Sequence, residues 1–107
     1  MNQLSSSIQR GDIGFPFEHE FLAEDGSPLD ISGASVIEYR FERPDATYLH
    51  VAGTFATDGQ DGRTVYLSAA GDLNLAGSWR YQVRLVIGAG FERSTAPIAF
   101  EVAHNIP

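Results

Sequence analysis

The chain has 107 residues and a formal net charge of −7 at pH 7, and it contains neither lysine nor cysteine. A chain of this length folds as one domain with its own hydrophobic core. Its 14 acidic residues outnumber its seven arginines, and this balance argues against a DNA or RNA partner, because nucleic-acid binding depends on clustered cations. No apolar segment reaches the ~20 residues that span a bilayer, and the start of the chain lacks a secretory signal pattern. We therefore expect a protein that is made in the cytoplasm and has no nucleic-acid or membrane partner.

The N-terminal segment is polar and serine-rich, and Leu4 and Ile8 are its only apolar anchors. Chain ends of this composition are usually poorly ordered unless they are tied down. We therefore expect residues 1–9 to form a flexible arm and residues 10–107 to form the folded domain.

The first strand is expected within residues 12–24, where apolar and polar side chains alternate. A period of two is typical of a half-buried strand. Pro16 cannot donate a backbone hydrogen bond, so this strand should lie at a sheet edge or contain a bulge. The side chains expected on one face are Phe15, Phe17, His19 and Phe21, and those on the other include Glu18 and Glu20.

Turn residues and short strands then follow one another. The segment 24–34 is rich in residues that favour turns. The strand after it, 35–43, ends before Pro44, and its apolar face consists of Ile37, Tyr39 and Phe41. Further strands are expected at 47–55, 64–68, 91–95 and 97–103, with a glycine turn at 58–63 and a corner at 69–77.

The most regular alternation lies in residues 77–88. Its apolar side chains are Trp79, Tyr81, Val83, Leu85 and Ile87, and its polar side chains are Arg80, Gln82 and Arg84. Immunoglobulin-like sandwiches place an aromatic residue after a corner, where it pins the chain. We interpret Gly77, Trp79 and Tyr81 as such a structural corner, because these aromatics share a face with aliphatic core residues.

No segment has a helical period, and turn signals recur about every 8–12 residues, as in β-sandwiches. The chain is therefore predicted to be all-β. Its expected architecture is an immunoglobulin-like antiparallel β-sandwich of about seven strands in two sheets.

Histidine side chains, which are common metal ligands, are few and scattered. His19, His50 and His104 are the only imidazoles, and no two of them have the spacing of metal ligands. Glu18 and Glu20 would lie about 7 Å apart on one face of a strand, but a solvated or salt-bridged strand face explains them better than a carboxylate pair.

Reactive motifs are also missing from the sequence. The serines lie in the arm or in turns, and neither a nucleophile elbow nor a phosphate-binding loop occurs. The segment DGQDG at 58–62 lacks the ligand pattern of a calcium loop, so we interpret it as a turn. We expect no catalytic residue, no cofactor and no metal site, and therefore a protein that is not an enzyme.

The order of these segments resembles the immunoglobulin-like domain at the N-terminus of the phage baseplate upper protein family. The resemblance is carried by RGDIGFPFEHEFLAEDGSPLDISGASVIEYRFERPD near the start, and by LNLAGSWRYQVRL and FERSTAPIAFEVAHNIP near the end. It implies a non-enzymatic virion component, a tail or baseplate adaptor that docks other tail or receptor-binding proteins. Relatives usually continue into a long receptor-binding region and contain lysine, whereas this chain stops at Pro107, so that attachment is not carried over.

A protein of this kind acts through its surfaces. Three surfaces are candidates: the arm with Leu4 and Ile8, an acidic face with Glu18 and Glu20, and an arginine face with Arg80 and Arg84. The two charged faces are opposite in sign, so they could pair across one sheet or between neighbouring copies. We expect a monomer or a weak small oligomer in isolation, with a trimer as the favoured oligomer to match tail symmetry.

Two other functions remain open. A carbohydrate-binding module would need exposed aromatic side chains, for which Tyr48, Tyr66 and Phe91 are the candidates. A capsid decoration protein would have the same physical properties on the head of the particle.

Overall fold

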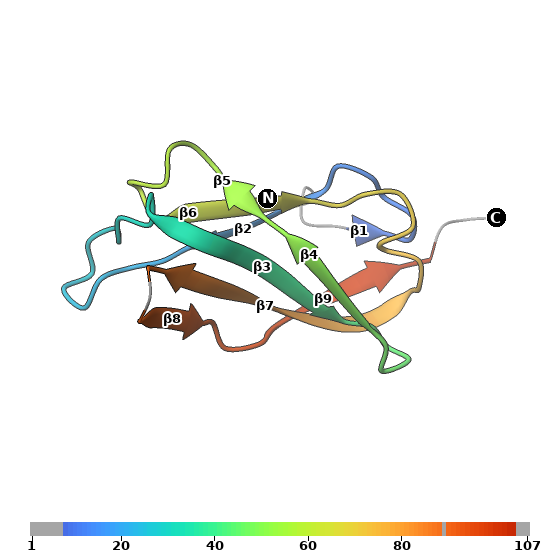
Figure 1. The fold of residues 1–107 in the computed structure, drawn as a ribbon. Helices are drawn as coiled ribbons and strands as arrows, with labels where there is room; N and C mark the ends of the chain where they lie inside the picture. Colours follow the sequence, from blue (N-terminus) through green and yellow to red (C-terminus); the bar gives the residue numbers. More distant parts are fainter. Residues whose placement is uncertain (1–7, 89, 105–107) are drawn as a thin grey trace.

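The computed structural model describes residues 8–88 and 90–104, which form nine strands and no helix (Figure 1). They build two sheets that enclose the core between them, so the predicted all-β sandwich is confirmed. In chain order the strands are β1 (Ile8–Gln9), β2 (Pro16–Glu20), β3 (Ala34–Glu42), β4 (Tyr48–Ala52), β5 (Thr54–Phe55), β6 (Arg63–Leu67), β7 (Gly77–Ile87), β8 (Phe91–Ser94) and β9 (Ile98–Ala103).

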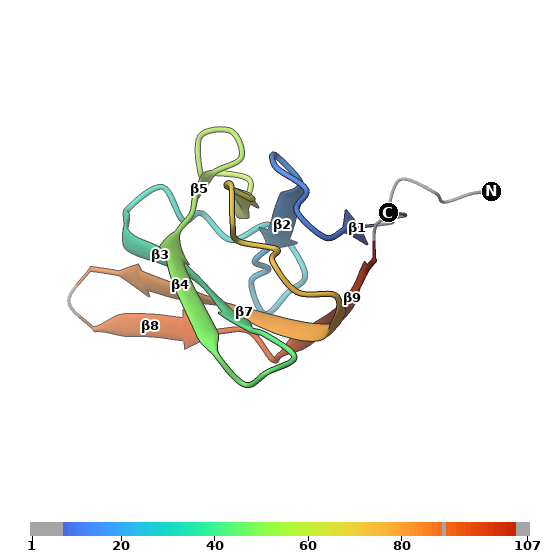
Figure 2. The same ribbon diagram turned by 90° about the vertical axis from the view of Figure 1, so that its right-hand side faces the viewer.

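The larger sheet has six strands in the order β1-β9-β7-β3-β4, and β8 also pairs with β7. β9 pairs with residues 77–81 of β7 and β8 with residues 84–87, so these two strands follow one another along the same edge of β7. The smaller sheet has the order β2-β6-β5, which makes β2 an edge strand, as Pro16 predicted. Figure 2 shows β2 and β5 on one side of the molecule and β3, β4, β7 and β8 on the other.

The core forms where the inward faces of the two sheets meet. Trp79, Tyr81, Val83 and Leu85 of β7 are all buried, as their alternation predicted. From the smaller sheet, Phe17 inserts its ring among aromatic neighbours. Its ring centroid lies 5.0 Å from those of Phe15 and Phe41, 5.4 Å from that of Tyr81 and 5.2 Å from that of Phe100. Such aromatic packing supplies much of the apolar area that is buried between the sheets.

The predicted boundary between arm and domain is wrong at Ile8 and Gln9. These residues form β1, which pairs in parallel with β9 through Ile8 and Val102. Ile8 is only 4% exposed and belongs to the core. A single isoleucine gives no alternation to detect, and its strand partner lies at the other end of the chain, so the local pattern could not reveal this pairing. Residues 1–7, with Leu4, lie outside the described part.

The strand that we predicted at 47–55 is divided at Gly53. Before this residue β4 belongs to the larger sheet, and after it β5 belongs to the smaller one. The Gly53 amide still donates to the carbonyl of Ile37, at 2.8 Å. A Cβ atom on Gly53 would stand 2.7 Å from the ring of Tyr39, so only glycine lets the chain pass this close to the core. This division and the addition of β1 explain why there are more strands than the seven expected.

A buried hydrogen bond joins the two sheets. The hydroxyl oxygens of Tyr39 in β3 and Thr64 in β6 lie 2.8 Å apart, and both residues are 0% exposed. The Thr64 hydroxyl donates in turn to the carbonyl of His19, at 3.4 Å, so the Tyr39 hydroxyl is the donor in the first bond. Burial raises the pKa of Tyr39 well above its usual range, so this donor keeps its proton.

Thr64→Val should lower the free energy of unfolding by about 1–3 kcal/mol, because it leaves the Tyr39 hydroxyl buried without an acceptor. Valine has nearly the shape of threonine, so packing changes little. Adding Tyr39→Phe to this variant removes the stranded hydroxyl and should recover part of the loss. Chemical denaturation of the two single variants and the double variant measures these values, and additive losses would contradict the interpretation.

Candidate functional site

The outer side of the larger sheet carries charged and amide side chains. Successive residues of a strand point to opposite faces, so buried Tyr39 and Phe41 of β3, and Tyr81 and Val83 of β7, leave their sequence neighbours outside. The antiparallel register aligns these neighbours in three cross-strand pairs: Glu38 with Arg84, Arg40 with Gln82, and Glu42 with Arg80. We call these six residues the polar face.

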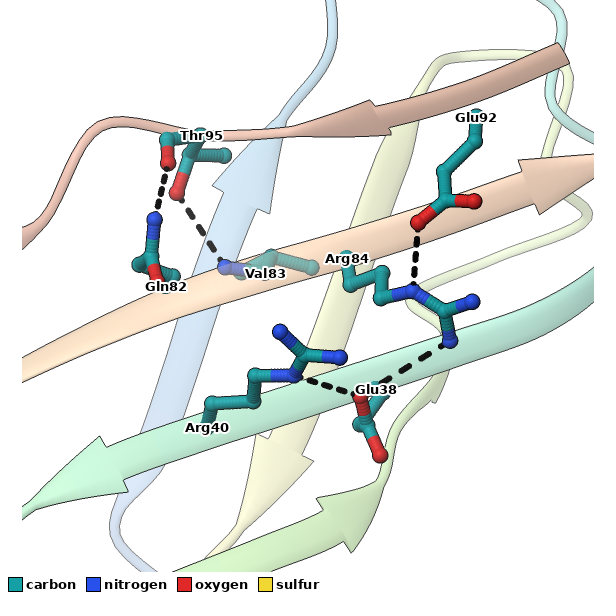
Figure 3. Close-up of polar contacts among 7 residues, drawn as sticks. All are labelled: Glu38, Arg40, Gln82, Val83, Arg84, Glu92 and Thr95. Atoms are coloured by element: carbon teal, nitrogen blue, oxygen red, sulfur yellow. Dashed lines mark hydrogen bonds and ion pairs between the residues drawn. The ribbon is translucent and has the colours of Figure 1, made fainter.

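Ion pairs run across this face from β3 to β8 (Figure 3). The Arg40 Nε atom donates to Glu38 Oε1 at 2.7 Å, and an Arg84 terminal nitrogen lies 3.8 Å from the same oxygen. On its other side, Arg84 Nε donates to Glu92 Oε2 at 2.7 Å. Arg80 also pairs with Glu42. Each arginine of the polar face is therefore held by at least one carboxylate of the same chain.

These pairs favour the charged forms of the residues that make them. The hydrogen bond from Arg40 holds the pKa of Glu38 below its usual value. The hydrogen bond to Glu92 raises the pKa of Arg84. Exposed pairs of this kind contribute little to stability, but they hold long side chains in one geometry.

Thr95 fills the gap in the sheet between β8 and β9. Its hydroxyl accepts a hydrogen bond from the Val83 amide at 3.1 Å, and its amide donates to the Val83 carbonyl at 3.0 Å. Its carbonyl accepts from Gln82 Nε2 at 2.9 Å (Figure 3). Thr95 therefore continues the pairing of β7 where neither neighbouring strand does.

A shallow depression of about 250 Å³ lies where β3, β4 and β7 meet. Two of the charged residues around it remain accessible, since the Arg40 side chain is 40% exposed and that of Arg80 is 59% exposed. The residues that line the depression include Arg40, Glu42, Tyr48, His50, Arg80 and Gln82. The depression thus combines guanidinium, carboxylate, imidazole, phenol and amide groups, which can exchange hydrogen bonds with a protein surface.

The predicted arginine face is not a cationic surface. Arg80 and Arg84 do lie together on the outside of β7, as expected. However, the register with β3 places Glu42 beside Arg80 and Glu38 beside Arg84, so carboxylates of the same chain offset their charge. The alternation within β7 could not show this, because the offsetting residues lie on another strand.

The predicted pairing of Glu18 and Glu20 with these arginines across one sheet is wrong. Both glutamates belong to β2 in the smaller sheet, whereas β7 belongs to the larger one. Glu20 instead lies beside Arg63 of β6, with Oε2 3.8 Å from Nε. The assignment of strands to sheets depends on long-range pairing, which a local pattern does not contain. Pairing between neighbouring copies stays a prediction.

At the structural corner that the sequence predicts, β7 begins at Gly77, and Trp79 and Tyr81 are both buried. The Trp79 indole nitrogen donates to the carbonyl of Leu75 at 3.0 Å and so ties the corner to the start of β7. The Arg43 guanidinium lies over the Trp79 ring, 5.7 Å from its centroid.

Ile8, a candidate for an interface, is buried in the core and so does not present its side chain to a partner.

The three candidate aromatics for sugar binding do not form one platform. Tyr48 of β4 is 64% exposed and Phe91 of β8 is 39% exposed. Tyr66 lies in the other sheet and packs against the core, with ring centroids 6.0 Å from Tyr39 and 5.9 Å from Phe41. The exposed aromatics therefore come from separate strands at separate places.

Tyr66 predicts a loss of stability at alkaline pH. Burial, together with its hydrogen bond to the Asp72 carboxylate, raises the pKa of Tyr66 to about 12. An unfolded tyrosine ionises near pH 10, so the stabilisation from this group is complete below pH ~10 and disappears as the pH rises through ~12. Tyr66→Phe should therefore show a shallower fall in unfolding free energy over this range. Denaturation at stepped pH measures both slopes, and equal slopes would contradict the assignment.

The described ranges contain no group of three or more histidine, cysteine, aspartate or glutamate residues placed to hold a metal ion. The segment 58–62 is a turn, in which the Asp58 carboxylate accepts from the Gln60 amide at 2.9 Å and the Asp61 carboxylate from the Arg63 amide at 3.1 Å. Within residues 8–88 and 90–104 we also find no helix with the length and apolar character needed to cross a bilayer.

Comparison with known proteins gave no match among family models, curated proteins or solved structures.

Sequence reasoning did not select Glu42, Glu92 and His50 as candidates, although they belong to or border the polar face. A signal was present, because Glu38, Arg40 and Glu42 alternate on one strand as Arg80, Gln82 and Arg84 do on another. Opposite patterns of charge on two strands favour their pairing.

Proposed function

We propose that this chain is a non-enzymatic structural protein of a phage particle, a tail or baseplate adaptor that docks other virion proteins through its polar face. The observation that carries the proposal is a row of ion pairs beside the depression on the larger sheet, which we call the ladder. It joins Arg40, Glu38, Arg84 and Glu92. The placement in a virion comes from the resemblance to the baseplate upper protein family.

The ladder suits docking because its charges are already positioned. Glu38 and Glu92 hold the guanidinium of Arg84 in place before a partner arrives, so less side-chain entropy is lost on binding. Within the described part of the chain, Arg40 donates through Nε alone, which leaves its terminal nitrogens for a partner's carbonyl or carboxylate groups. Paired charges of this kind determine orientation and specificity more than affinity.

Cross-linking of purified particles tests the proposal. A carbodiimide joins carboxylates to lysine amines, and this chain has no lysine, so every such link must lead to a different protein. We expect links from Glu42 and Glu92 to a lysine of a neighbouring virion protein. Absence of the chain from particles, or links that come only from Glu18 and Glu20 on the other sheet, would refute the docking face.

A variant pair adds a functional readout. Arg40→Ala combined with Arg80→Ala removes two accessible donors of the polar face and should reduce incorporation into particles. The matched control is Arg63→Ala, which removes an exposed arginine from the smaller sheet and should leave incorporation unchanged. Equal incorporation of the wild type, the double variant and the Arg63→Ala control would contradict the proposal.

The same cross-links distinguish the remaining alternatives. A link to a head protein would identify a capsid decoration protein instead of a tail adaptor. Binding to a glycan array that is lost with Tyr48→Ala would instead favour carbohydrate binding, since Tyr48 is the most exposed of the aromatic candidates.

A further inference from the structure

Strand β4 forms one edge of the larger sheet. It pairs with β3 on one side, and on its other side no described strand pairs with it. Two hydrogen bonds define its orientation: the Gly53 amide donates to Ile37, and the Arg43 amide donates to the carbonyl of Thr47, both at 2.8 Å. Odd-numbered residues therefore direct their backbone groups to β3. The amides and carbonyls of Tyr48, His50 and Ala52 point away from the sheet.

The other edges carry features that discourage strand pairing. β2 contains Pro16 together with Glu18 and Glu20, and β8 contains Glu92 and Arg93. β1 and β5 have only two residues each. Proline, charged side chains and short length are the means by which proteins protect sheet edges. The sequence of β4, YLHVA, has no proline, carboxylate, lysine or arginine.

We propose that β4 pairs with β4 of a second copy of this chain, antiparallel, about a two-fold axis that passes through His50. In this register His50 lies opposite the partner's His50, and Tyr48 lies opposite the partner's Ala52. The outward amides and carbonyls of all three residues then find partners in the second copy. The two larger sheets become one continuous sheet.

Side chains on both faces of the joint support a second copy as the occupant. On the outer face, Tyr48 is 64% exposed, and its ring would cover the small side chain of Ala52 across the axis. On the inner face, Leu49 and Val51 are packed at the margin of the core. Leu49 of each copy would lie opposite Val51 of the other copy. On the outer face a large side chain therefore meets a small one, and on the inner face apolar side chains meet each other. The strand is thus complementary to itself, as an interface with two-fold symmetry requires.

Charge does not oppose this pairing. The nearest carboxylates and guanidiniums are those of Glu38, Arg40 and Glu42, one strand further in, and each is already paired within its own chain. The inference goes beyond the proposed docking function and rests on β4 alone. It predicts a dimer, in place of the trimer expected from tail symmetry.

Sedimentation of the full chain over a range of concentrations should show a reversible dimer. His50→Pro removes the outward amide at the centre of the joint without removing a bond to β3, and it should abolish the dimer. His50→Ala keeps that amide and should still dimerise. Ala52→Pro is a second variant of the same design, in case His50→Pro unfolds, and thermal melts establish that each variant is folded.

Single cysteines test the register, because the chain has none of its own. His50→Cys brings two sulfurs together at the axis, where paired residues are ~5.5 Å apart, and should form a disulfide-linked dimer under mild oxidation. Tyr48→Cys places its two sulfurs four residues apart along the strands, ~13 Å, and should remain unlinked. Tyr48→Cys combined with Ala52→Cys should link again.

A monomer at every concentration, a trimer, or a dimer that survives a folded His50→Pro variant would overturn the proposal. Equal cross-linking of His50→Cys and Tyr48→Cys would overturn the register. None of these measurements involves a virion, so their failure would leave the proposed docking function untouched.

Discussion

Trp79→Ala is expected to lower the free energy of unfolding by about 3–5 kcal/mol, the usual cost of deleting a large buried aromatic side chain. Trp79 is 1% exposed, and its ring lies 5.8 Å from that of Phe100 and 6.5 Å from that of Phe41. The substitution also removes the hydrogen bond that holds the Leu75 carbonyl. Because small domains are stable by only about 5–15 kcal/mol, this variant should unfold at a much lower denaturant concentration.

Trp79→Phe separates the two contributions. Phenylalanine restores much of the apolar contact with Phe41 and Phe100 but has no group to donate to Leu75. Its loss of stability should therefore lie between those of the wild type and Trp79→Ala. Denaturation midpoints of the three proteins give the comparison, and an unchanged midpoint for Trp79→Ala would contradict the packing of the corner.

Gly62→Ala is expected to cost roughly 2–5 kcal/mol, the sum of left-handed backbone strain and of overpacking. Gly62 has a φ of +76°, and a Cβ atom there would overlap the carbonyl oxygen of Phe21 and lie 2.9 Å from that of Leu29. Both obstacles are backbone atoms, which cannot turn aside as a side chain would. The Gly62 carbonyl also accepts from the Phe21 amide at 2.8 Å, so a shift would disturb the end of β2.

Gly71→Ala is the matched control for Gly62→Ala. Gly71 has a φ of +85°, similar to that of Gly62, but a Cβ atom there would meet nothing within 4 Å. The control should therefore lose only the cost of the left-handed backbone, about 1–2 kcal/mol. Chemical denaturation of both variants measures the difference, and equal losses would show that the close approach at Gly62 is not what limits this site.

The sequence alone determined which side chains face the core along the longer strands. Tyr39 and Phe41 in β3, and Trp79 and Val83 in β7, are buried as their alternation predicted. Alternation is a local property, because successive side chains of any extended strand point to opposite faces. The edge position of β2 was predictable for a similar reason, since Pro16 lacks an amide hydrogen wherever it lies.

Other features could not be predicted because they depend on which strands become neighbours. Ile8 joins the core only because β1 reaches β9, and Gly53, where the chain changes sheets, must be glycine because the ring of Tyr39 lies against it. Neither partner is close in the sequence, and the period of two carries no information about distant pairing.

The candidate sites show the same distinction between local sequence and strand pairing. The sequence alone determined that Arg80 and Arg84 would share the outer side of one strand, and that Trp79 would follow a corner. Only the tertiary structure decided that Glu42 and Glu38 stand beside these arginines, and that β4 is an edge strand among the described strands. The physical reason is that a side chain's face follows from its own strand, whereas its neighbours, its net local charge and its access to a partner follow from how strands far apart in the chain are paired.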